Sequence, residues 1–392
     1  MSNNSNKVYS SVKDYYGKVL SSSKDLKTSA CTAGSAPHPL IRDIIGKQVP
    51  DAVNERFYGC GNPIPLGIEG LDVLDLGSGS GRDCYVAAAL VGPSGSVTGI
   101  DMTDEQLEVA RDNVAAFGRT LGYRPNLRFV TGYIEELQAA GVEPRSVDLC
   151  ISNCVVNLSP DKPAVLRGVY SSLRSGGELY FSDVYADADL PEALRTHDVL
   201  LGECIGGALH TDDFERIAAD DVGFARPRIL SAAHIEISDP ELRALVGNTQ
   251  FYSITYRLFK INSRSSADEQ TREETTSAVA TYLGTIPGHP DKYELDVDHA
   301  FAANEAAAVD SEVAAILAQS WLAKHFAVAE EAGNADAAAA ATTVKKATPT
   351  SVLLQRAHKL AQTQRTAAAA AASANSGGSS GCCSGSAKKK CC

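Results

Sequence analysis

The sequence predicts an α/β fold in which a mostly parallel sheet is covered by helices on both faces. Between about Leu71 and Lys260, apolar stretches of strand length alternate with stretches of helical periodicity. Short loops punctuated by Gly, Pro or Asp separate them, and such alternation is typical of parallel sheets. The chain has 392 residues, 44% of them hydrophobic, which is enough for one sizeable core and a smaller second one.

The individual elements follow from the apolar patterns. Strands are expected at LDVLDLG (71–77), SVTGID (96–101), LRFVTG (127–132), VDLCISNC (147–154) and GELYFSDVY (177–185). Helices are expected at GRDCYVAAALVG (81–92) and TDEQLEVARDNVAAFGRTLG (103–122), and the second has apolar positions three and four apart. FYSITYRLFK (251–260) is rich in aromatic and β-branched residues, which favours a late edge or hairpin strand.

The composition divides the chain into four parts. An N-terminal segment (1–70) precedes the α/β core (71–262), and a polar, charged linker follows Lys260. Residues 263–335 are expected to form a small C-terminal α+β domain with SEVAAILAQSWLAKHF as its helix. The tail (336–392) is rich in Ala, Ser and Gly and offers little large apolar surface, so we expect it to be disordered.

Charge and composition exclude several classes of protein. The net charge of −12 argues against a nucleic-acid partner, which normally needs a basic surface. No apolar run reaches the ~18 residues of a membrane span, and the polar N-terminus lacks the apolar core of a signal peptide. We therefore expect a cytoplasmic protein whose ten cysteines are thiols available for redox chemistry or for ligand binding. Nothing in the sequence demands a dimer, so a monomer is expected.

A glycine-rich turn, DLGSGSGRD (75–83), joins the first strand to the first helix. Gly77, Gly79 and Gly81 let the backbone turn sharply and approach a ligand closely. Their spacing is G-x-G-x-G, whereas the dinucleotide fingerprint is G-x-G-x-x-G. Asp101 closes the second strand 20 residues after Gly81, where a carboxylate accepts hydrogen bonds from ribose hydroxyls.

Together with Asp75, this set resembles the Rossmann-like class I S-adenosylmethionine-dependent methyltransferases, as does LRSGGELYFSD (173–183). The resemblance implies that S-adenosylmethionine lies against the turn, with Ile134 and Glu135 of TGYIEEL (131–137) beside the adenine. The residues that it assigns to the cofactor in this region are Asp75, Gly77, Ser78, Gly79, Gly81, Asp101, Met102, Ile134 and Glu135. A nicotinamide enzyme stays open as an alternative, which a test of methyl-donor analogues against NAD(P) would separate.

The cysteines divide into two groups. Outside the tail there is no paired C-x₂₋₄-C motif of the kind that zinc sites use. Cys84 lies early in the first helix and Cys150 inside the fourth strand, and both are expected to pack as small hydrophobes.

Three further cysteines are expected at the ligand-binding edge of the sheet. Asn153 and Cys154 stand at the carboxyl end of the fourth strand, where ligands of open α/β sheets bind. Cys204 lies in GECIGGAL, downstream of the fifth strand on the same side, and Cys60 in the Gly/Pro-rich loop RFYGCGNPIP before the first strand. A fourth cysteine, Cys31, stands in the polar stretch KTSACTAGS.

Converging thiolates without an imidazole or a carboxylate favour a soft, thiophilic substrate. Trivalent arsenic takes three sulfurs in a pyramid and keeps a lone pair, which can attack a sulfonium methyl without a general base. LKTSAC, FYGCG, DLGSGSGRDCYV, GIDMT, GYIEEL, SNCVVNL, GGELYFSDVY and GECIGGAL resemble, in this order, the motifs of arsenite methyltransferases over roughly residues 12–260.

The resemblance implies methylation of arsenite to mono- and dimethylated species, with S-adenosylmethionine as donor and thiols as reductant. Cys60, Cys154 and Cys204 match the arsenic-binding cysteines, and Cys31 a fourth one used in binding inorganic arsenite or in disulfide exchange. Residues 1–70 then form an arsenic-binding lid. The residues expected to contact the cofactor from the cysteine loops are Tyr58, Gly59 and Asn153. Arsenite or its thiol conjugates are the expected substrates, glutathione or a thioredoxin-like protein the reductant, and no metal ion is required.

Two other functions and the role of the tail stay open. A carbon methyltransferase acting on a lipid or quinone would need an apolar pocket and a base, and a thiol buffer for metalloids would not need the cofactor turn. The tail, which departs from many relatives, ends CCSGSAKKKCC and could capture arsenic, shuttle electrons or be dispensable. Truncation at residue 375 would distinguish these roles.

Overall fold

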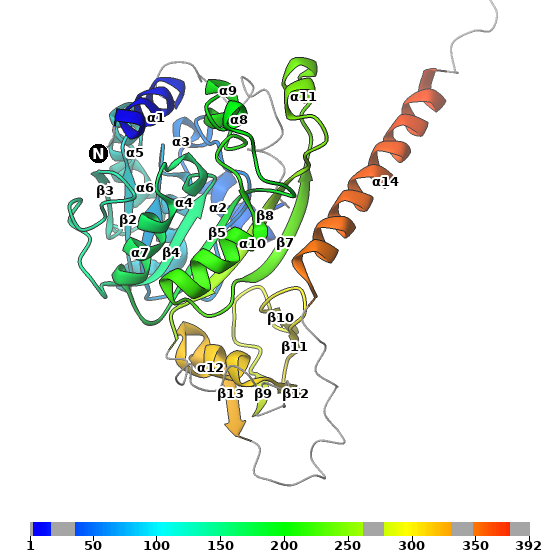
Figure 1. The fold of residues 1–392 in the computed structure, drawn as a ribbon. Coiled ribbons are helices and arrows are strands. Elements are labelled where there is room, and N and C mark those ends of the chain that lie inside the picture. The colour runs from blue at the N-terminus through cyan, green and yellow to red at the C-terminus, as the bar shows by residue number, and fades with distance from the viewer. Residues whose placement is uncertain (1–2, 17–35, 262–277, 331–347, 377–392) are drawn as a thin grey trace, which may run out of the picture.

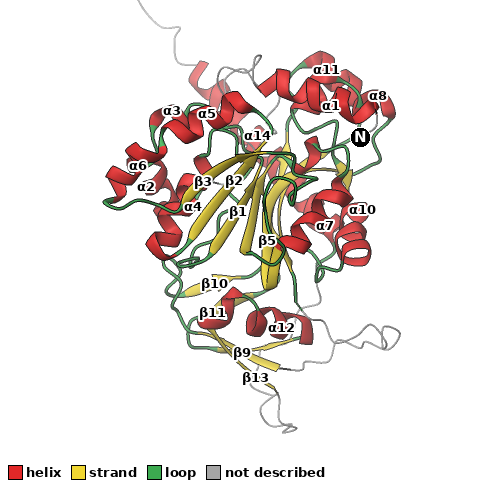
Figure 2. Cartoon of the chain, turned by 90° about the vertical axis from the view of Figure 1, so that its left-hand side faces the viewer, coloured by secondary structure: helices red, strands yellow, loops and turns green. Residues whose placement is uncertain are grey.

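The computed structural model describes residues 3–16, 36–261, 278–330 and 348–376. Its main body is an eight-stranded sheet with helices on both faces (Figures 1 and 2). The predicted fold class is confirmed. No helix in these ranges combines the length and the apolar character that crossing a bilayer requires.

The sheet has the strand order β3-β2-β1-β4-β5-β8-β7, with the short β6 paired to β5. Strands β1 to β5 run parallel, whereas β8 is antiparallel to both β5 and β7. The strands are β1 (Asp72–Leu76), β2 (Ser96–Asp101), β3 (Leu127–Thr131), β4 (Val147–Asn153), β5 (Leu173–Ala186), β6 (Leu209–His210), β7 (Arg228–Ile235) and β8 (Phe251–Phe259).

The two faces of the sheet carry separate apolar clusters because side chains alternate along each strand. Val73 of β1 and Ile151 of β4 pack on one side, and Leu74 and Cys150 on the other. Figure 2 shows α2, α4 and α6 over one face and α7 and α10 over the other. The helices of the core are α1 (Asn3–Asp14), α2 (Pro39–Lys47), α3 (Asp51–Asn54), α4 (Arg82–Val91), α5 (Asp104–Asp112), α6 (Val114–Leu121), α7 (Lys162–Ser172), α8 (Glu192–Arg195), α9 (Asp198–Gly202), α10 (Thr211–Arg216) and α11 (Pro240–Val246).

Two sequence predictions in the core are corrected. The helix expected over 103–122 is interrupted at Asn113, whose side-chain amide donates to the Val109 carbonyl 2.8 Å away and so competes for helical hydrogen bonds. The segment at 251–260 forms β8, which pairs antiparallel with the preceding strand β7, in keeping with the hairpin alternative. It lies between β5 and β7 with all nine of its residues buried, and is therefore not an edge strand. The edge strand on this side of the sheet is β7, which the sequence analysis did not identify.

A small C-terminal domain follows, built from antiparallel strands and one helix. Its sheet has the order β12-β9-β13, and β10 pairs with β11. The expected helix forms only as α12 (Ser311–Gln319), because the chain then makes a short 3₁₀ turn and enters β13. The strands are β9 (Ala278–Tyr282), β10 (Lys292–Glu294), β11 (Ala300–Ala302), β12 (Ala306–Val309) and β13 (Phe326–Glu330).

A buried ion pair joins the small domain to the sheet. Arg257 of β8 contacts the Glu178 carboxylate of β5 through two nitrogens, at 2.6 and 3.0 Å, and both side chains are almost fully buried. The guanidinium also donates to the Tyr293 hydroxyl of β10, while the Trp321 indole donates to Glu178. Removal of one member of such a buried ion pair would leave the other charge buried without a partner, which is strongly destabilising.

The tail is not disordered throughout. Residues Thr350–Ser376 form α14, which begins against β7 and extends away from the body (Figure 1). Leu354 is 5% exposed and packs on the sheet, and the Thr350 hydroxyl donates to Glu215. The first turns of α14 therefore make apolar contacts with the body, which the composition of the tail as a whole did not indicate. The linker after Lys260 and the cysteine pairs at the end lie outside the described residues.

Candidate active site

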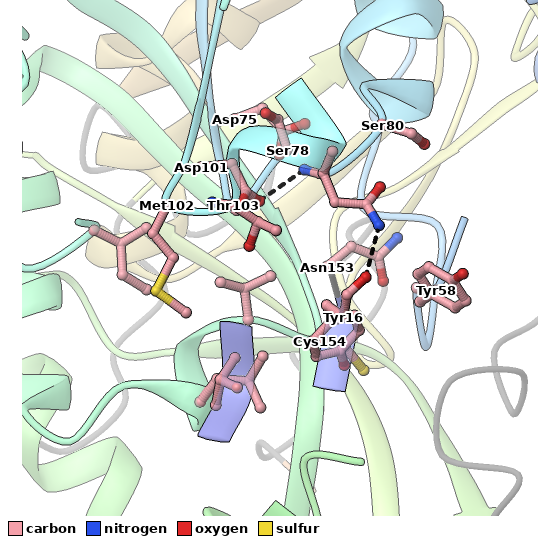
Figure 3. A pocket seen from close by; sticks show the side chains of 18 of the residues that line it. Tyr16, Tyr58, Asp75, Ser78, Ser80, Asp101, Met102, Thr103, Asn153 and Cys154 are labelled. Atoms are coloured by element: carbon pink, nitrogen blue, oxygen red, sulfur yellow. Dashed lines mark hydrogen bonds between the residues drawn. The ribbon is translucent and has the colours of Figure 1, made fainter. Parts of the chain in front are cut away.

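A pocket lies at the carboxyl ends of β1, β2 and β4, above the glycine-rich turn (Figure 3). Most residues that the sequence assigned to a cofactor line it. These are Tyr58, Gly59, Asp75, Gly77, Ser78, Gly79, Asp101, Met102, Ile134, Glu135 and Asn153. Gly81 does not line the pocket; it precedes α4 with φ of 93°.

The turn is held open toward the pocket by its backbone conformation. Gly77 and Gly79 have φ values of 64° and 52°, which favour glycine, and nothing lies within 4 Å of a Cβ built on Gly79. The Gly79 amide donates to the Asp101 carboxylate at 2.8 Å, which ties the turn to the end of β2. The Ser78 hydroxyl, by contrast, is buried and has no hydrogen-bond partner within the described residues.

Three carboxylates surround the turn. Asp101 accepts from the backbone amides of Gly79 and Thr103, and burial raises its pKa above the usual value. Burial and the nearby charge of Asp83 raise the pKa of Asp75 well above its usual range. A cationic ligand beside these carboxyl groups would favour their ionised form, so the pocket suits a ligand that carries positive charge.

Cys84 does more than pack. Its thiol is fully buried, as expected, but it donates to the Asp75 carboxylate at 3.1 Å. Burial and Asp75 raise the pKa of this thiol well above its usual value, so it stays protonated. Cys150 lies in the apolar cluster beneath the helices, and burial raises its thiol pKa as well.

The three loop cysteines lie together at the floor of the pocket. Cys60 and Cys154 form a disulfide with their α-carbons 5.6 Å apart, and the Cys204 thiol donates to the Cys154 carbonyl at 2.9 Å. All three are buried, and only Cys154 also lines the pocket. Cys154 and Cys204 both have a left-handed backbone, with φ of 59° and 63°, which is uncommon outside glycine and concentrates at functional sites.

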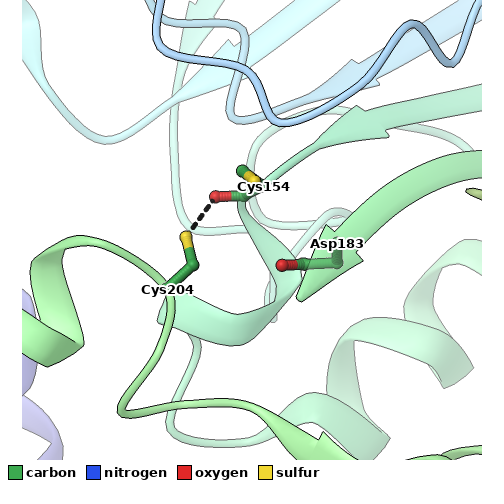
Figure 4. A group of neighbouring side chains, drawn as sticks. All are labelled: Cys154, Asp183 and Cys204. Carbon is green, nitrogen blue, oxygen red and sulfur yellow. Dashed lines mark hydrogen bonds between the residues drawn. The ribbon is translucent and has the colours of Figure 1, made fainter. Parts of the chain in front are cut away.

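An unexpected carboxylate joins the sulfur atoms. Asp183, at 1% exposure, brings an oxygen so close that it and the sulfurs of Cys154 and Cys204 all lie within 4.8 Å of one another (Figure 4). Backbone amides of Asn157 and Val184 donate to this carboxylate at 3.0 and 2.8 Å. Burial raises its pKa to about 6. The sequence analysis missed Asp183, although its place near the end of β5, beside Cys154, was a usable signal.

Asn153 connects the pocket to the cysteine loop. Its side-chain oxygen accepts from the Gly61 amide, and its amide nitrogen donates to the Gly61 carbonyl, both at 3.0 Å. The same nitrogen donates to the Asp83 carboxylate at 2.8 Å. Asp83 was also missed by the sequence analysis, although it stands two residues after the last glycine of the turn.

The N-terminal segment covers the pocket. Tyr9, Val12 and Tyr16 line it, and the Gln106 amide donates to the Tyr16 carbonyl at 3.1 Å. The Tyr16 hydroxyl donates to the carbonyl of Gly202, two residues before Cys204. Tyr16 therefore contacts both the cofactor side and the cysteine side of the site. Cys31 lies outside the described residues.

Comparisons with known proteins agree with this arrangement. A family model described as a methyltransferase domain matches residues 69–221, and one described as the arsenite methyltransferase C-terminal domain matches 275–392. The second match includes residues 336–392 of the tail.

Full-length relatives are similar over most of the chain. An arsenite methyltransferase of Mus musculus is 42% identical over 363 residues, covering 92% of this chain and 93% of the mouse protein. One of Homo sapiens is 44% identical, with coverages of 81% and 82%. The crystal structure of an arsenic(III) S-adenosylmethionine methyltransferase from Chlamydomonas reinhardtii is 52% identical, with a TM-score of 0.71, covering 76% of this chain and 98% of that one.

Proposed function

The chain belongs to the family of arsenite methyltransferases, and on that premise we propose how its pocket and cysteines carry out the reaction. The enzyme methylates arsenite with S-adenosylmethionine as donor. One observation carries the proposal: Cys154 is both a wall of the cofactor pocket and a member of the sulfur cluster. A group held by Cys154 therefore faces the pocket without any intervening layer of protein.

The pocket fits S-adenosylmethionine on the chemistry of its lining. Asp101, Ile134 and Glu135 line the pocket, and we assign Asp101 to the ribose hydroxyls and the other two to the adenine. The buried carboxylates of Asp75 and Asp83 suit the positively charged methionine end, and the unpartnered Ser78 hydroxyl offers a further polar contact. When bound, the cofactor supplies an electrophilic methyl group on a sulfonium sulfur.

The arsenic ligands are the thiolates of Cys60, Cys154 and Cys204, with Cys31 as a fourth cysteine for inorganic arsenite. Soft sulfur donors select a thiophilic centre, and arsenic keeps the lone pair that reacts. Because that lone pair is the nucleophile, the site needs no general base. Holding the reactants close and in line supplies on the order of 7–11 kcal/mol of the barrier.

The Cys60–Cys154 disulfide supports a redox role for the same residues. Transfer of a methyl cation formally raises the oxidation state of arsenic by two. Two thiols that become a disulfide release two electrons and two protons, which restores the trivalent state. A small thiol such as glutathione, or a thioredoxin-like dithiol, then re-reduces the pair by exchange. No metal ion takes part in this sequence.

The test is to identify the products formed from arsenite, S-adenosylmethionine and glutathione by mass spectrometry. The full chain should give mono- and dimethylated arsenic, and no methylated arsenic should form without the methyl donor. Cys204→Ser should give none, whereas Cys150→Ser, which changes a buried thiol in the apolar cluster outside the pocket and the sulfur cluster, should retain methylation. Methylation by Cys204→Ser at the parent rate would refute the three-thiolate site.

A further inference from the structure

Asp183 is one donor more than arsenic chemistry uses beside Cys60, Cys154 and Cys204. Trivalent arsenic is satisfied by three sulfurs, and its fourth direction is taken by the lone pair. The sulfur of Cys60 is bonded to that of Cys154, so reduction of the disulfide adds a third sulfur beside the two sulfurs and the carboxylate of this group. All four side chains are buried.

Three thiolates and one carboxylate are a donor set that tetrahedral zinc accepts. With Zn–S bonds of about 2.3 Å, two sulfurs of a tetrahedral site lie about 3.8 Å apart. The sulfurs of Cys154 and Cys204 and an oxygen of Asp183 already lie within 4.8 Å of one another, so these three donors have to move only about half an ångström each. The Cys60 sulfur, which is bonded to that of Cys154, takes the fourth position when that bond is broken. Movement of that size is within the reach of side-chain rotation once the Cys60–Cys154 bond is broken.

We propose that the reduced site of Cys60, Cys154, Cys204 and Asp183 binds a thiophilic divalent cation, with zinc as the representative, in competition with arsenic. A dithiol reductant first converts the disulfide to two thiols and is itself oxidised to a disulfide. The cation then replaces the thiol protons, which pass to solvent, and no electron is transferred to it. Zinc held there blocks arsenite binding and hence methylation.

The surroundings of Asp183 support its role as the fourth ligand. Its carboxylate is oriented by the backbone amides of Asn157 and Val184, and each oxygen retains a further lone pair. Outer hydrogen bonds of this kind fix the direction of a metal ligand. The charge of Lys162 acts on both Asp183 and Cys204, which offsets part of the negative charge of four anionic donors.

The experiment uses the full chain in a background where five other cysteines, which would also bind zinc, are replaced by serine. These are Cys31, Cys382, Cys383, Cys391 and Cys392. The protein is reduced with a phosphine, the phosphine is removed under nitrogen, and Zn²⁺ binding is measured by equilibrium dialysis. We expect one zinc per chain, and Co²⁺ in its place should give the visible absorption of a tetrahedral thiolate centre.

Two variants separate the zinc site from the arsenic site. Asp183→Asn should weaken zinc binding at least tenfold and change arsenite binding less than about twofold, whereas Cys204→Ser should weaken both. Asp187→Asn, an exposed carboxylate just after β5, is the matched control and should bind both like the background protein. Added arsenite should release zinc one for one.

Three results would overturn the proposal: no zinc bound to the reduced background protein, equal zinc affinity in Asp183→Asn, or simultaneous binding of zinc and arsenite. The Co²⁺ spectrum of the background protein decides the case even if Asp183→Asn does not fold. Because zinc binding is measured directly, its outcome is independent of whether arsenite is methylated.

Discussion

Asn153→Ala should separate arsenic handling from cofactor binding. The Asn153 side chain makes three hydrogen bonds, two with the backbone of Gly61 and one with Asp83. Gly61 follows Cys60 directly, so these bonds hold the cysteine loop against the cofactor turn. Both donors of the amide are already used, so the side chain has little capacity left for a direct cofactor contact. Its removal should therefore displace Cys60 and leave the cofactor pocket largely unchanged.

The size of the effect follows from the bonds that are lost. Each neutral hydrogen bond contributes about 1 kcal/mol, and the one to the Asp83 carboxylate about 2, which gives an upper bound of about 4 kcal/mol. Water can replace part of this because Asn153 is partly exposed. We take about half, roughly 2 kcal/mol, which corresponds to about a 30-fold loss of kcat/KM for arsenite at about 1.4 kcal/mol per tenfold.

The assay measures kcat/KM for arsenite under saturating S-adenosylmethionine, together with the Kd of the cofactor by calorimetry. The cofactor Kd should change less than about fivefold, since the one lost bond to Asp83 is the only link to the cofactor turn. Asn126→Ala is the matched control, because that amide makes two backbone hydrogen bonds at the opposite edge of the sheet. An unchanged kcat/KM, or a loss explained wholly by weaker cofactor binding, would refute the role of Asn153 in holding the cysteine loop against the cofactor turn.

Other predictions test the cysteines, the domain contact and the pH dependence. Cys154→Ser and Cys204→Ser should reduce methylation below detection in the product assay while cofactor binding persists; activity of either at the parent rate contradicts the site. Glu178→Ala leaves Arg257 buried without its counter-charge, so urea unfolding should show a loss of about 3–5 kcal/mol, and a loss below about 1 kcal/mol would contradict it. Folding raises the pKa of Asp183 from 3.8 to about 6, so its contribution to stability is complete below pH 4 and is lost as the pH rises through 6. Relative to Asp183→Asn, the free energy of unfolding should therefore fall by about 3 kcal/mol between pH 4 and 6.5, and parallel pH profiles would be evidence against this.

Local patterns in the sequence predicted the core of the fold well. The first five strands were identifiable because each is a short apolar run between turn residues, as β4 and β5 show. The failures have a common cause, which is tertiary context. Nothing local distinguishes the inner strand β8 from an edge strand, and the packing of Leu354 on the sheet depends on β7, which lies far away in sequence.

The candidate site was predictable where a motif carries the chemistry. The glycine turn and Asp101 follow known spacing, and Cys60, Cys154 and Cys204 stand in short distinctive motifs. The missed residues are those whose importance arises only when distant segments meet. Asp183 belongs to the site because the fold brings Cys204 close to it. Tyr16 belongs to it because it contacts both Gln106 and Gly202, which lie on different segments.

The central claim is that three protein sulfurs hold arsenic at the floor of the cofactor pocket. It is tested most directly by X-ray absorption at the arsenic edge on the reduced protein, in the background lacking Cys31 and the tail cysteines, with one equivalent of arsenite. The account predicts three sulfur neighbours and no oxygen, falling to two sulfurs and one oxygen in Cys204→Ser. Arsenic bound by fewer than three sulfurs in the parent, or an unchanged spectrum in the variant, would contradict it.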